Sequence, residues 1–171
     1  MTTGQIWPRG SRDHGAAVTT ARQLTGRIHV DLPPGEAFRL FTPLGEQDWV
    51  PGWQPRFPAP AADDTEPGTV FETVAHGHRS VWIVTERKPG VRISYARLTP
   101  GSQAGTVTVT ISPAGGHSDV EVTYRLTALT EEGASGLREF ADGYAAYLRS
   151  WQDAISAWLD PRDLHPGGHH D

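Results

Sequence analysis

Two segments in the second half of the chain alternate strictly between apolar and polar residues: GTVTVTIS at 105–112 and DVEVTYRLTAL at 119–129. A period of two is typical of a β-strand with one buried face. Three earlier segments are also rich in β-branched and aromatic residues: TVFETVAH (69–76), RSVWIVTER (79–87) and RISYARL (92–98). Short turns containing Gly or Pro separate these segments, so residues 69–129 are expected to form an antiparallel meander.

The flanking segments complete an α+β domain. LTGRIHVDL (24–32) predicts a first strand, and PPGEAFRLF (33–41) predicts a short helix with Pro34 in its first turn. Between Ser135 and Leu159 apolar residues recur every three or four positions and predict one long amphipathic helix, closed by Pro161. These residues are Leu137, Phe140, Tyr144, Tyr147, Leu148, Trp151, Ile155, Trp158 and Leu159.

This element order predicts a curved antiparallel sheet wrapped around a long C-terminal helix, with short helices after the first strand. Residues 1–22 are small, polar and aperiodic and are expected to form a flexible N-terminal arm. Residues 161–171 are expected to form a flexible tail. The domain is therefore expected to span residues 23–160.

The composition excludes several kinds of chemistry and partner. The 171 residues carry a formal net charge of −5 and no cysteine, which excludes disulfides, thiolate metal sites and cysteine nucleophiles. Because Lys and Arg form no run, nucleic acid is not expected as a partner. No apolar segment has the length of a membrane span, and the first residues do not resemble a signal peptide, so we expect a cytoplasmic protein without stable membrane insertion.

Hairpin geometry predicts which side chains share the inner face of the sheet. A type II′ turn at Gly77-His78 would pair Thr73 with Trp82, and a turn at Pro89-Gly90 would pair Trp82 with Arg97. The first turn also pairs Phe71 with Val84, and the second pairs Val84 with Tyr95. The inner face then collects Phe71, Thr73, Trp82, Val84, Ile93, Tyr95, Arg97, Val107, Val109, Ile111, Val120, Val122, Tyr124 and Leu126.

Three apolar residues, Val74, Val81 and Ile83, fall on the outer face in this register. Either the register is shifted there, or these residues pack against a partner. Arg97 is the opposite exception, since a buried guanidinium needs a partner or water. Either Arg97 lies near a strand end and reaches solvent, or it lies in a solvated cavity and binds a polar group of a ligand.

The segment EQDWVPGWQPRF (46–57) carries aromatic residues on a path that Pro and Gly make irregular. A sheet curled around a helix leaves one open end, and this segment has the composition of a lid across it. Trp49, Trp53 and Phe57 would then face inward. The alternative is that these side chains simply fill the core, as large aromatic residues commonly do.

Together these features resemble the SRPBCC superfamily, with its START-like or pollen-allergen-like helix-grip fold. The resemblance covers about Gln23 to Leu159 and rests on the element order and on FTPLGEQDWVPGW, VWIVTER, YARLTPGS and VTYRLTAL. It is close to the small bacterial polyketide cyclase/dehydrase-like members. It implies a cavity for apolar or amphipathic small molecules, with Trp49, Trp53 and the helix face around Tyr144 in its wall. The candidate ligand-binding residues are Trp49, Trp53, Phe57, Phe71, Thr73, Trp82, Tyr95, Arg97, Tyr124 and Tyr144.

No nucleophile elbow, phosphate loop, dinucleotide fingerprint or zinc-protease motif occurs in the sequence. His76 and His78 could share a strand face, but a polar turn explains them better than a metal site. His29 is interpreted as solvated, beside Arg27 and Asp31, so neither a metal site nor a cofactor is expected. Glu46 and Asp48 are placed on the exposed side of a short helix.

Three hypotheses for function follow. The first is a carrier that binds a hydrophobic or aromatic, lipid- or polyketide-like molecule. The second is a cyclase/aromatase-like enzyme in which Arg97 stabilises an enolate and Tyr95 or Tyr124 donates a proton. The third is an interaction module of the chaperone-activator kind, using the outer apolar residues. The protein is expected to be a monomer or a homodimer.

Overall fold

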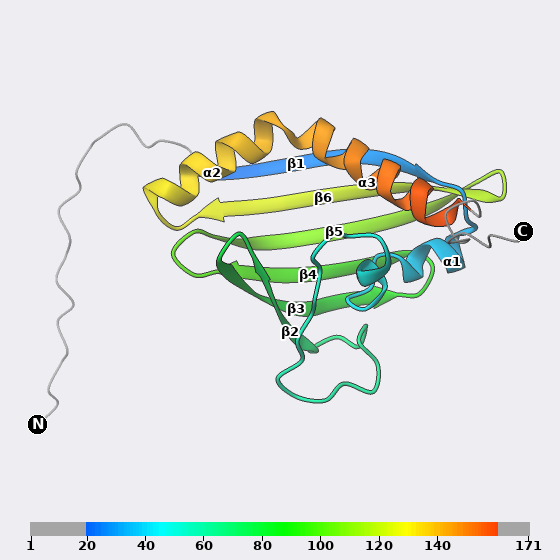
Figure 1. The fold of residues 1–171 in the computed structure, drawn as a ribbon, viewed down its shortest axis with the longest axis horizontal. Helices are drawn as coiled ribbons and strands as arrows, with labels where there is room; N and C mark the ends of the chain where they lie inside the picture. The colour runs from blue at the N-terminus through cyan, green and yellow to red at the C-terminus, as the bar shows by residue number, and fades with distance from the viewer. Residues whose placement is uncertain (1–19, 161–171) are drawn as a thin grey trace, which may run out of the picture.

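Six antiparallel strands form one curved sheet in the order β1-β6-β5-β4-β3-β2 (Figure 1). The computed structural model describes residues 20–160. The strands are β1 (Ala21–Val30), β2 (Val70–Ala75), β3 (His78–Lys88), β4 (Arg92–Thr99), β5 (Gln103–Ala114) and β6 (His117–Ala128). The helices are α1 (Pro34–Arg39), the short 3₁₀ helix η1 (Gly45–Asp48), α2 (Glu131–Asp142) and α3 (Tyr144–Leu159).

The two halves of the sheet are covered differently. Figure 1 shows α2 and α3 lying along the β1 and β6 half, and α3 packs on β1. The chain between α1 and β2 crosses the other half as an irregular loop, which Arg56 ties to Glu72 of β2 through two backbone hydrogen bonds of 2.8 Å. The α+β helix-grip architecture expected from the sequence is therefore confirmed.

The C-terminal helix is interrupted, contrary to the prediction of one continuous helix from Ser135. It divides at Gly143, which lies between α2 and α3 with φ −96° and ψ 5°. It also begins earlier, at Glu131, because the Thr130 hydroxyl caps the helix by accepting a hydrogen bond from the Gly133 amide at 3.0 Å. Of the predicted apolar stripe, Trp158 and Tyr147 remain 40% and 37% exposed.

The first strand begins before the predicted domain boundary at residue 23. Ala21 and Arg22 pair with Thr127 and Leu126 of β6, so they are strand residues and not part of an N-terminal arm. The rest of the predicted arm and the predicted tail at 161–171 lie outside the described residues. Gly26 of β1 permits close packing of α3, because a Cβ at this position would lie 2.4 Å from the Leu148 side chain.

The β2–β3 hairpin differs from the predicted register by two residues. Its turn is His76-Gly77, with φ of +52° and +78°, as in a type I′ turn with two positive φ angles. Thr73 therefore pairs with Ser80, and Phe71 with Trp82. Because side chains alternate with a period of two, a shift of two leaves every residue on its predicted face.

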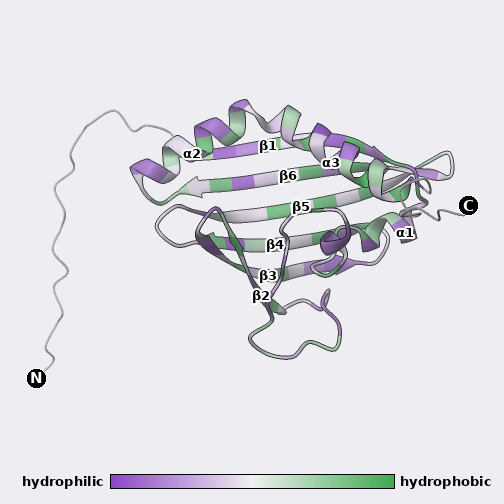
Figure 2. Cartoon of the chain, viewed as in Figure 1, coloured by the Kyte–Doolittle hydropathy of each residue, from purple (hydrophilic) through white to green (hydrophobic). Residues whose placement is uncertain are grey.

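The β3–β4 pairs Trp82–Arg97 and Val84–Tyr95 agree with the prediction. Nearer the turn the register differs, because Lys88 pairs with Arg92 across a loop one residue longer than predicted, and a β-bulge between Val84 and Glu86 offsets the extra residue. Every predicted inner-face residue except Arg97 is buried, and apolar and polar residues alternate along the strands in Figure 2. Val74 and Ile83 lie on the outer face, 62% and 40% exposed. The hairpin shift is thus not the reason that these apolar residues face outward.

Candidate functional site

A cavity of about 350 Å³ lies between the β2–β4 half of the sheet, the loop after η1 and α3. Binding sites for small molecules begin at about this size. Its wall is formed by Glu46, Val50, Pro51, Gly52, Trp53, Phe71, Thr73, Val74, Ala75, His76, Ser80, Trp82, Tyr95, Arg97, Val107, Val109, Tyr124, Tyr147 and Trp151. Exposed wall residues occur on two sides, at 51–52 and at 74–76, so the cavity reaches the surface between the loop and the β2–β3 turn.

Aromatic rings make up most of the apolar wall. The rings of Phe71 and Trp82 stack at 5.7 Å with an interplanar angle of 4°, and Tyr95 meets both edge-on. Trp53 meets Trp82 edge-on at 5.6 Å, and its indole N–H donates to the Pro43 carbonyl at 2.8 Å. This bond fixes Trp53 on the loop and holds its ring against the sheet.

Thr73 satisfies a polar group of this wall. The Trp82 indole N–H donates to the Thr73 hydroxyl at 3.0 Å, and both residues are buried. A hydroxyl that serves a buried neighbour in this way stabilises the wall. The hydroxyl of Thr73 therefore serves to hold the Trp82 ring in place, although the residue also lines the cavity.

Arg97 brings a permanent positive charge into the cavity. Its guanidinium lies 5.5 Å from the Trp82 ring centre and 5.9 Å from that of Tyr124, which are cation–π distances. One terminal nitrogen donates to the Gln103 side-chain oxygen at 3.3 Å. Its Nε is buried without a hydrogen-bond partner. Of the two alternatives for Arg97, the structure supports the one that places it in a cavity.

The tyrosines differ in how free their hydroxyls are. The Tyr95 hydroxyl donates to the Phe41 carbonyl at 2.8 Å, so its proton is already engaged. Burial raises the pKa of Tyr124 well above its ordinary value of 10.0, and the neighbouring Tyr147 raises it further. Burial also raises the pKa of Tyr147. These phenols are therefore neutral near pH 7 and can act only as hydrogen-bond donors or acceptors.

Among the wall residues that sequence reasoning missed, Glu46 is the acidic one. It lies on η1, where the sequence suggested an exposed helix side, but its side chain lines the cavity. Burial raises the pKa of the Glu46 carboxyl well above its ordinary value of 4.5. Among residues 20–160 no hydrogen bond or ion pair to this carboxyl is found. A protonated carboxyl here could donate a hydrogen bond or a proton to a ligand.

The structure brings together seven of the ten candidate residues: Trp53, Phe71, Thr73, Trp82, Tyr95, Arg97 and Tyr124. The other three lie outside the cavity wall. Trp49 packs edge-on against Phe41 and Trp151 and donates to the Leu40 carbonyl at 2.7 Å, as a core residue would. Phe57 packs on Phe71, and the Tyr144 hydroxyl donates to the Val122 carbonyl at 2.5 Å.

Comparison with known protein families places most of the chain in one family. Residues 21–150 match the family model described as polyketide cyclase / dehydrase and lipid transport. The chain belongs to this family. The SRPBCC resemblance inferred from the sequence is thereby confirmed. Comparison with curated proteins gives no match.

Solved structures share the fold at low sequence identity. An uncharacterized protein from Rhizobium leguminosarum has a TM-score of 0.60 and 17% identity, covering 80% of this chain and 95% of its own. CalU16 from Micromonospora echinospora has a TM-score of 0.59 and 20% identity, with coverages of 84% and 80%. The Aha1 dimer from Colwellia psychrerythraea has a TM-score of 0.58 and 14% identity, with coverages of 81% and 99%. At such identities these likenesses establish the fold alone.

No helix among residues 20–160 is both long enough and apolar enough to cross a bilayer.

Proposed function

We propose that this chain binds a hydrophobic or aromatic small molecule, lipid- or polyketide-like, that carries one anionic or hydrogen-bond-accepting group. Membership of the family described as polyketide cyclase / dehydrase and lipid transport supports an apolar ligand. The observation that carries the proposal is Arg97, whose buried Nε has no partner in a cavity walled by aromatic rings. An unpaired buried donor costs about 1–3 kcal/mol, and an acceptor on the ligand would recover that cost.

The ligand class follows from this wall. Trp53, Phe71 and Trp82 offer ring faces and edges to a flat apolar body. Arg97 would pair with a carboxylate, enolate or phenolate at one end of that body. Glu46, in its protonated form, would donate to a second oxygen. A cavity of about 350 Å³ suits a molecule of a few fused rings better than a long acyl chain.

The test is a titration of aromatic carboxylates of one to three fused rings, followed by intrinsic tryptophan fluorescence and by thermal unfolding. We expect a saturable fluorescence change and a higher melting temperature for at least one compound. Trp53→Ala should weaken that response, whereas Trp49→Phe, a change in the core beside the cavity, should leave affinity unchanged. A panel that gives neither a fluorescence change nor thermal stabilisation would refute the proposal.

A second candidate function is catalysis of the cyclase type. Glu46 and Arg97 favour it, because a cavity that holds a protonatable acid and a fixed cation can protonate one atom while stabilising negative charge on another. With the Tyr95 hydroxyl bound to Phe41 and the pKa of Tyr124 raised well above 10.0 by burial, the proton would come from Glu46. Glu46→Gln should then abolish turnover and preserve ligand affinity, whereas a carrier would show no turnover in either form.

The third candidate, an interaction module, has less support. It required a filled interior and an exposed apolar patch at Val74, Val81 and Ile83. The interior instead contains the cavity, and Val81 is half-buried. A cytoplasmic location and a monomeric or homodimeric state remain predictions from the sequence.

A further inference from the structure

A ladder of paired polar side chains runs along the outer face of β1 and β6, on the opposite side of the sheet from the cavity. Its rows are Thr25 with Thr123, Arg27 with Glu121, and His29 with Asp119. Arg27 and Glu121 form an ion pair at 3.2 Å, as expected for opposite charges facing each other on neighbouring strands. In the next row, His29 takes the place of a permanent cation and faces Asp119.

The histidines belong to two short motifs that run in opposite directions. In the first motif, His29 and Val30 end β1 and Asp31 follows the strand, whereas His117-Ser118-Asp119 begins β6. Because Val30 pairs with Ser118 in an antiparallel register, each histidine lies across from the aspartate of the other motif. Two copies of the pattern His-x-Asp therefore place two imidazoles and two carboxylates on one outer surface.

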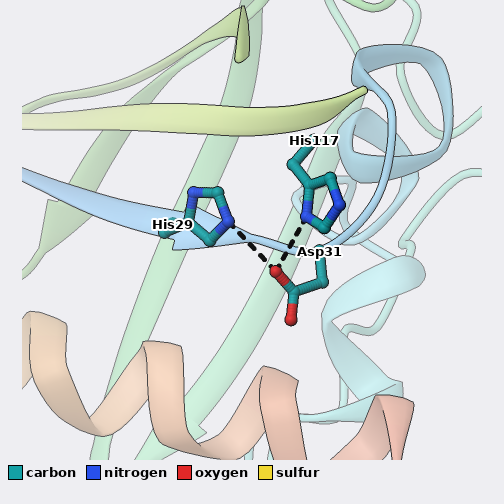
Figure 3. A group of neighbouring side chains, drawn as sticks. All are labelled: His29, Asp31 and His117. Carbon is teal, nitrogen blue, oxygen red and sulfur yellow. Dashed lines mark hydrogen bonds and ion pairs between the residues drawn. The ribbon is translucent and has the colours of Figure 1, made fainter. Parts of the chain in front are cut away.

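The imidazoles converge on one carboxylate oxygen, as Figure 3 shows. Asp31 Oδ1 lies 3.0 Å from His29 Nε2 and 2.9 Å from His117 Nδ1. The two rings are stacked, with centroids 5.5 Å apart and an interplanar angle of 16°. One ligand atom from each of the three residues lies within 4.8 Å of the others, and no other group of this kind occurs among residues 20–160.

The backbone holds the three residues in place. Ser118 is fully buried, and its hydroxyl donates to the Leu32 carbonyl at 2.7 Å, which ties the segment after β1 to β6. The His29 amide donates to the Gln152 side chain of α3 at 2.8 Å, so the free edge of β1 is also tied down. The side chains themselves are about half exposed and can adjust by small rotations.

The distances suit a small ion bound by nitrogen and oxygen. Zinc binds imidazole nitrogen and carboxylate oxygen at about 2.0–2.2 Å, so two ligands of one tetrahedral ion lie roughly 3.3 Å apart. The two nitrogen-to-oxygen distances of 3.0 and 2.9 Å need to widen by only a few tenths of an ångström.

Asp119 supplies the usual outer partner of a metal-binding histidine. Its Oδ1 lies 3.5 Å from His29 Nδ1, on the side of the ring opposite to Asp31. Histidines that bind metals through one nitrogen commonly donate the other N–H to a carboxylate, which orients the ring. Imidazole nitrogen also favours zinc, nickel or copper over calcium or magnesium.

We propose that His29, Asp31 and His117 bind one divalent transition-metal ion, such as Zn²⁺, on the outer face of the sheet, with Asp119 orienting His29. Three protein ligands leave a fourth position of the ion open to water or to an exogenous ligand. The ion would also cross-link β1 to β6. This site is independent of the cavity and of the function proposed for it.

The test is a Zn²⁺ titration of the full-length chain carrying His165→Asn, His169→Asn and His170→Asn, which removes the histidines near the C-terminus as competing ligands. We expect one Zn²⁺ per chain and a higher melting temperature, because the ion binds the folded sheet.

His29→Asn and His117→Asn should each abolish both effects. Asp119→Asn should weaken binding about tenfold. His78→Asn, an exposed histidine on β3, should change nothing.

Melting temperatures in a chelator establish that each variant is folded before metal is added. If zinc neither binds at one per chain nor stabilises the fold, the proposal is wrong. It is also wrong if zinc still stabilises both His29→Asn and His117→Asn, because the ion would then bind elsewhere on the chain.

Discussion

The two halves of the inner sheet face are built from different residues because different elements cover them. On the half covered by α2 and α3, β1 and β6 present aliphatic side chains such as Ile28, Val120 and Val122, which belong to the same core as Leu148 and Ile155 of α3 and are at most 4% exposed. Under the loop, β2–β4 present aromatic rings together with Arg97 and Thr73. Aliphatic side chains fill the grooves of a regular helix surface. The irregular loop packs less closely on the sheet and leaves the cavity, whose wall includes the polar residues Arg97, Thr73 and Glu46.

The comparison implies that core substitutions under the helix should lower stability without altering binding. Ile155 is 1% exposed and lies outside the cavity wall. Ile155→Ala should lower the free energy of unfolding by about 2–5 kcal/mol, measured by urea denaturation. Affinity for the best compound in the aromatic carboxylate series should stay within about twofold. A loss of binding at temperatures where the variant is folded would show that the two halves are not separable.

Substitution of Arg97 should have the opposite effect: it should lower ligand affinity and leave stability nearly unchanged. Arg97→Met keeps a long side chain against Trp82 and Tyr124 but removes the charge and the unpaired Nε. Affinity for an aromatic carboxylate should fall by roughly 10- to 100-fold, since a hydrogen bond to a charged group contributes about 1.5–3 kcal/mol.

For Arg97→Met, the free energy of unfolding should change by less than about 1 kcal/mol, because the variant also removes an unsatisfied donor. The neutral analogue of the same compound is the control, and its affinity should be similar for both proteins. Equal weakening for the acid and its neutral analogue would mean that Arg97 supports the wall and does not bind the ligand.

The smallest effect is expected from Glu46 and concerns pH. Burial raises the pKa of Glu46 well above 4.5 in the folded protein, so the folded state retains a proton that the unfolded chain loses above about that pH. Glu46 should therefore make the protein less stable as pH rises from 4.5 to the folded pKa, with no further change above it.

Glu46→Gln removes this dependence. Its stability should match that of the wild type near pH 4 and exceed it by a growing margin toward neutral pH, in urea denaturation series at each pH. Asp48→Asn, on the same short helix but exposed, should show no such margin. If the free energy of unfolding depends on pH in the same way for Glu46→Gln and the wild type, the Glu46 carboxyl is in solvent and the account of its burial is wrong.

The strands were predictable because their period of two fixes which face each residue occupies. That alternation placed Arg97 and Tyr95 inside. The pair Val84–Tyr95 was correct only because a β-bulge between Val84 and Glu86 offsets a turn one residue longer than predicted. The β2–β3 turn was misplaced, because His76 adopts a positive φ, which only a few per cent of residues other than glycine do. The shift was harmless only because it equals the strand period.

The site was less predictable wherever it depends on irregular backbone or on distant pairing. Glu46 lies on a short 3₁₀ helix, where no periodicity distinguishes inside from outside. Trp49 and Trp53 are four residues apart on one loop, and only the fold separates the core residue from the cavity residue. His117 meets Asp31 across 86 positions, which is visible only once β1 is paired with β6.

The most direct measurement is to fill the cavity and repeat the titration. Val107 of β5 is 4% exposed and lines the cavity. It pairs with Tyr95 of β4 on one side and with Tyr124 of β6 on the other. Val107→Phe projects a ring into the space and should lower affinity for the best aromatic carboxylate at least tenfold, with a stability change of about 1–3 kcal/mol at most. Undiminished affinity in a folded Val107→Phe protein would mean that the ligand binds elsewhere and that the space between sheet and loop is not a binding site.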